Sequence, residues 1–384
     1  MKNRRRSALT HSLAGLAICA LAAGCHSNNN SNNNSDAGSG NDAGSGSDAG
    51  SGSDAGSGND AGSGSDAGTD AGSDAGTDAG PLGTGTPTTS AVIANGTEPF
   101  DAAPSPDGTQ VYFSGTDNAL GAAIFKVPAA GGTATVIASG MNCGTTATCI
   151  GVPFGVAVSS DGNTVYAADP AFRGASANDN GAIFKVPASG GEPAALAETV
   201  DYAPYEVTVA KVGGADNIYF IGQDPASGDP GIFMDAASHV TSVIQGGAAN
   251  GPQAVAVAGD GTVYYVDTNG GVQKVLAGVA TAIVSGTKAL NVSFPAGIAV
   301  SQDGKAVLVP NVDPTTMAPG VARIDVSSGA VTQLTFTPAL TTLNSTVGGL
   351  HRAGNAEVYS FVDTGAGTGT GSEIYSTGTV YLLK

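Results

Sequence analysis

Short apolar runs alternate with turn residues along most of the chain, and one such pattern recurs. In its clearest copy, Pro153 to Tyr166, an apolar run at 155–159 is followed by Asp161-Gly162 and then by a second apolar run. Asp-Gly between two apolar runs favours a tight hairpin turn, because glycine readily adopts the positive φ that such turns require. The pattern therefore predicts two antiparallel strands joined by a turn.

The pattern returns at intervals of about 43–55 residues, a period typical of propeller blades. Each repeat also contains a third and a fourth strand-length run, as in Ala182–Pro187 and Ala194–Ala197. The repeats predict an all-β fold, a six-bladed β-propeller of four-stranded antiparallel blades, with five or seven blades as the alternatives. The turns lie near Asp107, Asp161, Asp216, Asp260, Asp303 and Gly354.

The repeats make up one domain, residues 88–384, and its first and last segments together complete the last blade. The last repeat reaches Lys384 without a fourth strand, whereas residues 88–94 resemble the fourth strand of the first repeat, residues 133–138. We therefore expect the N-terminal strand of the domain to close the ring. Closure of this kind pairs a sheet edge that would otherwise be open to aggregation.

The motif Pro-x-Gly-Val-Ala-Val, with Asp-Gly and Val-Tyr after it, resembles the repeats of NHL, YVTN and Tol-Pal-type propellers. The resemblance covers the whole domain, but its positions specify blade packing and imply no reaction. It implies that ligands bind at the mouth of the central channel. At this face the first strand of each blade begins and the second strand of each blade ends. The Trp-Asp repeat type is excluded because the chain has no Trp.

Residues 1–24 have the features of an export signal: basic residues are followed by an uncharged run, 12–24, that is too short to span a bilayer. The run ends in Leu21-Ala-Ala-Gly-Cys25, which resembles a bacterial lipoprotein box. The resemblance implies that Cys25 becomes the lipidated, palmitate-bearing first residue of the mature chain, with ordinary secretion as the alternative. In enterobacterial lipoproteins an Asp after the lipidated Cys signals retention at the inner membrane. Because His26 stands at this position instead, the resemblance implies the outer membrane of a Gram-negative-type bacterium.

Residues 25–87 are almost entirely small or polar and contain nine Asp-Ala-Gly triplets between Asp36 and Gly80. Such a segment cannot bury a core, and we expect a disordered tether. A calcium-binding repeat is the alternative, but the triplets lack the regular apolar position that a β-roll needs.

Charge and cysteine content narrow the candidate partners. The formal net charge is −18, with no basic cluster beyond the first few residues, which disfavours nucleic-acid binding. Cys143 and Cys149 remain after signal removal, and in an oxidising compartment we expect them to form a disulfide. Two sulfurs with no nearby His or further Cys cannot complete a zinc site.

Candidate site residues interrupt a packing rule. In blades two, four and five the first strand has small residues at alternate positions, such as Gly155 and Ala157, which let neighbouring blades pack closely. Blades one, three and six instead have Asp101, Glu206 and the pair His351-Arg352 in this strand. Aromatic residues follow the first proline in three blades. Buried charge is tolerated mainly when it is paired or functional. We predict a ligand site at the channel mouth, formed by Phe100, Asp101, Phe154, Tyr205, Glu206, His351 and Arg352.

Two simpler interpretations of these residues remain open. The aromatic side chains could plug the channel, and Asp101 and Arg352 could form an ion pair between neighbouring blades. A related interpretation concerns Asp117, Asp169, Asp224, Asp267, Asp313 and Asp363, which follow the second strands and could either bind calcium or cap turns.

No sequence motif specifies a reaction. The chain has no His-Glu-x-x-His motif, no nucleophile elbow and no phosphate-binding loop. We therefore expect a lipid-anchored propeller of the cell envelope that binds another envelope protein or a small ligand, and a purely structural envelope protein is a further interpretation. The alternative is an enzyme, a calcium-assisted lactonase or lyase with its site at the channel mouth. Calcium is the only candidate cofactor.

Overall fold

The structure is a computed structural model of the chain. It describes residues 89–94, 97–117, 121–140, 150–172, 180–285, 290, 292, 296–313, 316, 318–336, 347–354, 357–363 and 378–384. The expected signal segment, the expected lipidation site Cys25, the expected tether, and Cys143 and Cys149 all lie outside these residues. Among the described residues, no helix is long and apolar enough to cross a membrane.

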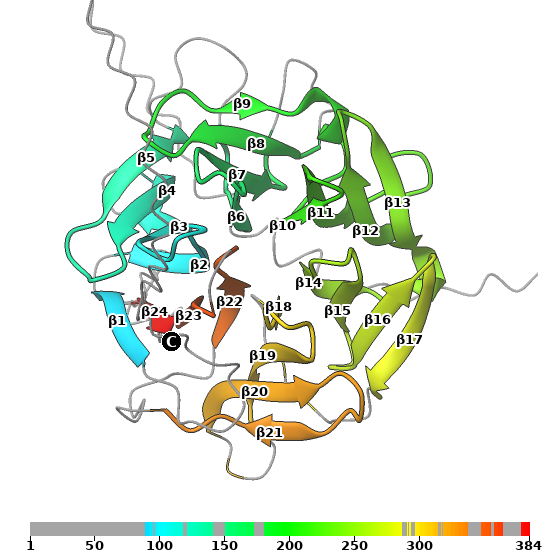
Figure 1. The fold of residues 1–384 in the computed structure, drawn as a ribbon. Helices are drawn as coiled ribbons and strands as arrows, with labels where there is room; N and C mark the ends of the chain where they lie inside the picture. The colour runs from blue at the N-terminus through cyan, green and yellow to red at the C-terminus, as the bar shows by residue number, and fades with distance from the viewer. Residues whose placement is uncertain are drawn as a thin grey trace, which may run out of the picture. The chain divides into compact units, whose positions relative to one another are not determined.

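The described strands form six antiparallel sheets of four strands each, arranged as blades around a central axis (Figure 1). Blade one contains β2 (Thr97–Pro104), β3 (Gln110–Asp117), β4 (Gly121–Pro128) and β5 (Thr135–Ser139). Blade two contains β6 (Val156–Val158), β7 (Thr164–Asp169), β8 (Ala182–Pro187) and β9 (Ala194–Ala195). Blade three contains β10 (Glu206–Val212), β11 (Ala215–Gln223), β12 (Pro230–Asp235) and β13 (Val240–Gln245).

The second half of the ring follows the same plan. Blade four contains β14 (Pro252–Val257), β15 (Val263–Asp267), β16 (Val272–Leu276) and β17 (Val279–Val284). Blade five contains β18 (Ala299–Val300), β19 (Ala306–Val312), β20 (Pro319–Asp325) and β21 (Val331–Gln333). Blade six contains β22 (Val347–Arg352), β23 (Tyr359–Asp363), β24 (Thr379–Leu383) and β1 (Thr89–Ala94). Two short 3₁₀ turns, η3 (Ala197–Thr199) and η4 (Gly246–Ala248), follow blades two and three. The predicted fold class is confirmed.

Ring closure occurs as the sequence predicts. β1 pairs antiparallel with β24, from Thr89 opposite Leu383 to Ala94 opposite Thr379, and supplies the fourth strand of blade six. The N-terminal strand thus joins the first and last parts of the propeller through backbone hydrogen bonds.

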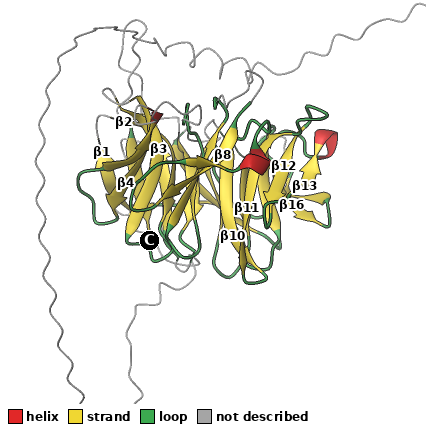
Figure 2. Ribbon diagram, turned by 90° about the horizontal axis from the view of Figure 1, so that it is seen from above, coloured by secondary structure: helices red, strands yellow, loops and turns green. Residues whose placement is uncertain are grey.

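The Asp-Gly positions form the tight turns between the first and second strands. Gly108 and Gly162 have φ of +68° and +74°, values that favour glycine. The Asp161 carboxylate accepts hydrogen bonds from the Asn163 backbone N–H at 2.9 Å and from the Ser159 hydroxyl at 2.6 Å. The turns and loops lie at the two ends of the upright strands (Figure 2).

The hydrophobic core lies between neighbouring blades. One described cluster joins Ala103 and Ile124 of blade one to Val156 and Phe184 of blade two, and comparable clusters join the other blade pairs. The small residues of the first strands permit this approach. A Cβ added at Gly155 would lie 2.8 Å from Cα of Glu206 in the next blade.

The disulfide between Cys143 and Cys149 stays a prediction, because both residues lie outside the described part of the chain. Closing so short a loop should stabilise the protein by about 2 kcal/mol. Mass spectrometry of the exported protein, with and without reduction before alkylation, should show both thiols blocked until reduction. Two thiols alkylated without reduction would contradict the pairing.

Candidate functional site at the channel mouth

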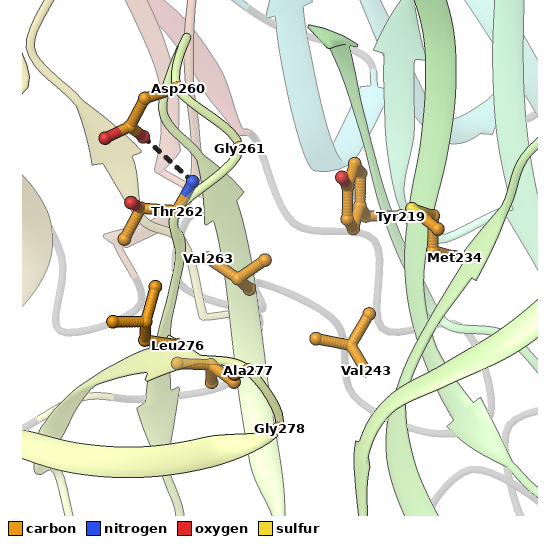
Figure 3. A pocket seen from close by; sticks show the side chains of 11 residues that line it. Tyr219, Met234, Val243, Asp260, Gly261, Thr262, Val263, Leu276, Ala277 and Gly278 are labelled. Atoms are coloured by element: carbon orange, nitrogen blue, oxygen red, sulfur yellow. Dashed lines mark hydrogen bonds between the residues drawn. The ribbon is translucent and has the colours of Figure 1, made fainter. Parts of the chain in front are cut away.

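One hollow of the described structure that is large enough to receive a small group lies away from the channel. It has a volume of about 210 Å³ and lies between blades three and four (Figure 3). Tyr219, Met234 and Val243 line one side, and the turn Leu276–Gly278 lines the other. Its charged group is Asp260, whose carboxylate accepts a hydrogen bond from the Thr262 backbone N–H and so caps a turn. This hollow offers apolar contact but no reactive group.

The second hollow lies at the predicted channel mouth and is much smaller, with a volume of about 10 Å³. Space of this size holds about one water molecule, whereas pockets for small organic ligands measure roughly 300–1,000 Å³. Its lining residues come from the starts of five blades: Phe100, Asp101, Phe154, Tyr205, Glu206, Gln253 and Ala296.

Aromatic side chains close this cavity. The rings of Phe100 and Phe154 lie 5.1 Å apart between centroids, and Phe100 is buried while Phe154 is partly exposed. The Tyr205 hydroxyl donates a 2.6 Å hydrogen bond to the carbonyl of Pro252, which attaches blade three to blade four. Burial raises the pKa of Tyr205. We refer to Phe100, Phe154 and Tyr205 as the aromatic cap, and its closure agrees with the plug interpretation.

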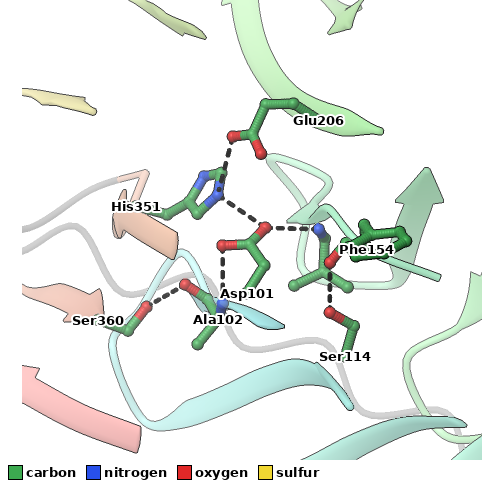
Figure 4. Close-up of polar contacts among 8 residues, drawn as sticks. Asp101, Ala102, Ser114, Phe154, Glu206, His351 and Ser360 are labelled. Atoms are coloured by element: carbon green, nitrogen blue, oxygen red, sulfur yellow. Dashed lines mark hydrogen bonds and ion pairs between the residues drawn. The ribbon is translucent and has the colours of Figure 1, made fainter. Parts of the chain in front are cut away.

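Next to the cap, three ionisable side chains from different blades converge (Figure 4). Nε2 of His351 lies 3.0 Å from Oδ2 of Asp101 and 3.6 Å from Oε1 of Glu206. The three residues are 2% (Asp101), 6% (Glu206) and 6% (His351) exposed, so little solvent screens their charges. We call Asp101, Glu206 and His351 the channel triad.

Backbone hydrogen bonds hold the Asp101 carboxylate in place. Oδ1 accepts from the Ala102 N–H at 2.8 Å, and Oδ2 accepts from the Val156 N–H of the neighbouring blade at 2.7 Å. Ser114 donates its hydroxyl to the carbonyl of Phe154, which positions the adjacent part of the cap. No sequence pattern marks Ser114 for this role.

A bulge in β22 places His351 in the triad. Gly348 lies opposite Val362 but His351 lies opposite Ser360, so β22 contains one extra residue between these pairs. Gly349 within the bulge has φ of +55°, and a Cβ there would lie 2.7 Å from Cα of Asp101. Glycine is therefore required both for the backbone conformation and for contact with blade one.

Glu206 is the least satisfied member of the triad. Burial, and then the nearby Asp101 carboxylate, raise the pKa of Glu206 well above its ordinary value. Its Oε1 atom is buried and has no hydrogen-bond partner. Either a proton or a cation at this position would relieve the cost of burying two carboxylates together.

Six of the seven predicted site residues thus gather at one place, and Arg352 does not. Its Nε atom donates to the carbonyl of Val300 at 2.8 Å, and its Nη1 atom donates to the carbonyl of Ala353 at 2.9 Å. The expected ion pair between Asp101 and Arg352 is wrong, because Asp101 pairs with His351 instead. Neighbouring residues on a strand point to opposite faces, so His351 and Arg352 cannot both face the channel.

The aspartates after the second strands serve as turn caps where their contacts are described. Asp169 accepts from the backbone N–H groups of Val152 at 3.0 Å and Ala171 at 2.9 Å. Asp267 accepts from the N–H groups of Asn269 and Gly271, each at 2.9 Å. These carboxylates satisfy local backbone donors, in agreement with the turn-cap interpretation.

Comparison with known proteins identifies the fold. No protein-family model matches the chain, and no curated protein matches it in sequence. A gluconolactonase structure from Xanthomonas campestris is 12% identical over 78% of this chain and 89% of its own, with a TM-score of 0.51. A protein of unknown function from Bacteroides thetaiotaomicron is 15% identical over 77% of this chain and 75% of its own, with a TM-score of 0.50.

A more distant match is TolB from Acinetobacter baumannii. It is 14% identical, with a TM-score of 0.44, and the alignment covers 61% of this chain and 56% of the TolB chain. The two matches with TM-scores of 0.51 and 0.50 agree with the propeller fold, whose six four-stranded blades the structure itself shows.

Proposed function

We propose that this protein is an exported, lipid-anchored propeller of the cell envelope that binds an envelope protein or a small ligand at the face bearing the aromatic cap. The observation that carries the proposal is the narrow channel mouth, where the hollow lined by the aromatic cap has a volume of only about 10 Å³. Partly exposed Phe154 and Tyr205 offer ring surface on this face. Aromatic side chains of this kind often contribute strongly to binding interfaces.

The second candidate function is a metal-assisted lactonase or lyase. The buried channel triad favours it, because carboxylates and an imidazole can hold a metal ion. The cap opposes it, because a substrate would have to displace Phe100, Phe154 or Tyr205 to reach the triad. The donor set also suits calcium poorly, since Ca²⁺ takes six to eight oxygen ligands.

The anchoring part of the proposal is tested by lipid labelling. The full chain should incorporate an alkyne-tagged palmitate and sediment with the outer-membrane fraction of a Gram-negative host. Cys25→Ser should lose the label and leave the membrane fraction, because the acyl chains provide the anchorage. Cys19→Ser is the matched control and should keep both properties. Labelling of the Cys25→Ser variant would contradict the proposal.

The binding part is tested with the same purified protein. Tyr205→Ala should weaken association with envelope components crosslinked to the wild-type protein, whereas Tyr264→Phe, outside the cap, should leave it unchanged. Hydrolysis of δ-lactones should stay at the background rate with Ca²⁺, Zn²⁺ or Mn²⁺ present. Metal-dependent turnover that is lost in Glu206→Gln would favour the enzyme instead.

A further inference from the structure

We propose that the channel triad is a binding site for one divalent transition-metal ion of the Zn²⁺, Mn²⁺ or Co²⁺ type. The inference does not depend on the proposed function, because a metal held here can join blades one, three and six in a binding protein as well as in an enzyme. Asp101 comes from β2, Glu206 from β10 and His351 from β22.

The distances suit a small ion. One donor atom from each residue can be chosen so that all three lie within 4.8 Å of one another, and His351 Nε2 lies 3.0 Å from Asp101 Oδ2 and 3.6 Å from Glu206 Oε1. A tetrahedral ion with bonds of about 2.0–2.2 Å places its ligand atoms roughly 3.3–3.6 Å apart. Small side-chain movements would therefore bring all three donors to bonding distance.

A second observation, the state of the Glu206 carboxylate, also favours a cation as the ligand. Oε1 of Glu206 is buried, lies within the triad and has no hydrogen-bond partner. An unsatisfied buried carboxylate oxygen is costly, and proteins retain one mainly where a ligand or a role compensates. A metal ion between Glu206 and Asp101 would satisfy this oxygen and neutralise both carboxylates.

The surroundings of Asp101 resemble the support that metal ligands usually have. Backbone N–H groups of Ala102 and Val156 orient its carboxylate, and Gly349 lies against its backbone. Such outer contacts fix a ligand before the metal arrives. The adjacent cavity of about 10 Å³, lined by both Asp101 and Glu206, has room for one water molecule as a further ligand.

The donor chemistry selects the class of ion. An imidazole nitrogen with two carboxylate oxygens suits zinc, manganese, iron or cobalt, whereas calcium and magnesium prefer oxygen ligands alone. We therefore favour a transition-metal ion over calcium, which was only a candidate cofactor of the alternative enzyme interpretation. Burial of all three residues also predicts slow exchange with chelators, because solvent reaches the site poorly.

Metal titration of the full-length protein, purified without a polyhistidine tag and stripped with chelator, tests the proposal. Co²⁺ should bind with one high-affinity equivalent per chain and produce visible d–d absorption. Zn²⁺ should displace it and raise the melting temperature, and Ca²⁺ should do neither. Glu206→Gln and His351→Asn should each weaken Co²⁺ binding by at least about 100-fold, because removal of a ligand should cost no less than the roughly 10–100-fold loss seen when an outer contact of a ligand is removed.

Glu198→Gln in η3 is the matched control and should titrate like the wild type. Absence of a high-affinity Co²⁺ site in the wild-type protein, or unchanged binding in Glu206→Gln, would overturn the proposal. So would stabilisation by Ca²⁺ without stabilisation by Zn²⁺. If the variants fail to fold, an anomalous-scattering map of zinc-soaked wild-type crystals tests the site instead. The proposal requires a zinc peak in contact with all three side chains. A map whose peaks all lie elsewhere would refute it.

Discussion

Deleting residues 88–94 should lower the melting temperature by on the order of 10 °C or more, because the propeller then loses a complete strand of blade six. β1 contributes backbone pairing to β24 from Thr89 to Ala94. Without it, the edge of β24 is exposed, and open edges promote pairing with other chains. We therefore also expect the deleted protein to oligomerise, as measured by light scattering.

Two further variants make this test specific. Deleting residues 27–80 removes far more chain but none of the described strands, and its melting temperature should stay within about 2 °C of wild type. Moving residues 88–94 to follow Lys384 through a short glycine-rich turn should restore stability, since β1 and β24 are antiparallel. Equal melting temperatures for the two deletions, or no rescue by the transferred strand, would contradict ring closure as the source of stability.

Gly349→Ala should destabilise the protein by about 3 kcal/mol, which for a propeller of roughly 300 residues corresponds to about 5 °C in melting temperature. Two effects combine: alanine is strained at φ of +55°, and its Cβ would lie 2.7 Å from both Cα and Oδ1 of Asp101. The contact is with backbone and with a carboxylate fixed by hydrogen bonds, so neither can move freely. Because the added Cβ would push Asp101 out of position, Gly349→Ala should also weaken Co²⁺ binding at the channel triad.

Gly354→Ala is the matched control for Gly349→Ala. Gly354 follows β22, is exposed, and a Cβ there would make only an ordinary 3.5 Å contact with Pro106. It should change the melting temperature by less than about 2 °C. Wild-type stability of Gly349→Ala would show that the bulge relaxes and that His351 does not depend on it.

The fold could be predicted from the sequence because its determinants are local and repeated. Asp161-Gly162 and its counterparts specify hairpins by their own chemistry, and residues 88–94 match residues 133–138 directly. Each copy of the repeat supports the interpretation of the others, so one degenerate blade does not obscure the architecture.

The site could be predicted only in part. Asp101, Glu206 and His351 stand out as polar breaks in a pattern of small residues, which located the triad. The partner of Asp101 was mistaken because opposite charge favours Arg352, whereas the bulge at Gly349 and strand alternation bring His351 inward. The volume of the cavity at the channel mouth, and the lack of a hydrogen bond to Oε1 of Glu206, depend on how the six blades meet. No single repeat specifies either of them.

Ring closure by β1 has a mechanical consequence. Any force transmitted along the chain from before Thr89 enters the propeller through the outermost strand of blade six and reaches β2 of blade one only after β1 has detached from β24. Pulling on the N-terminal end should therefore open the ring at this seam first. Blades one and six would then remain connected by their shared hydrophobic cluster and by the contact between the Asp101 and His351 side chains, on β2 and β22.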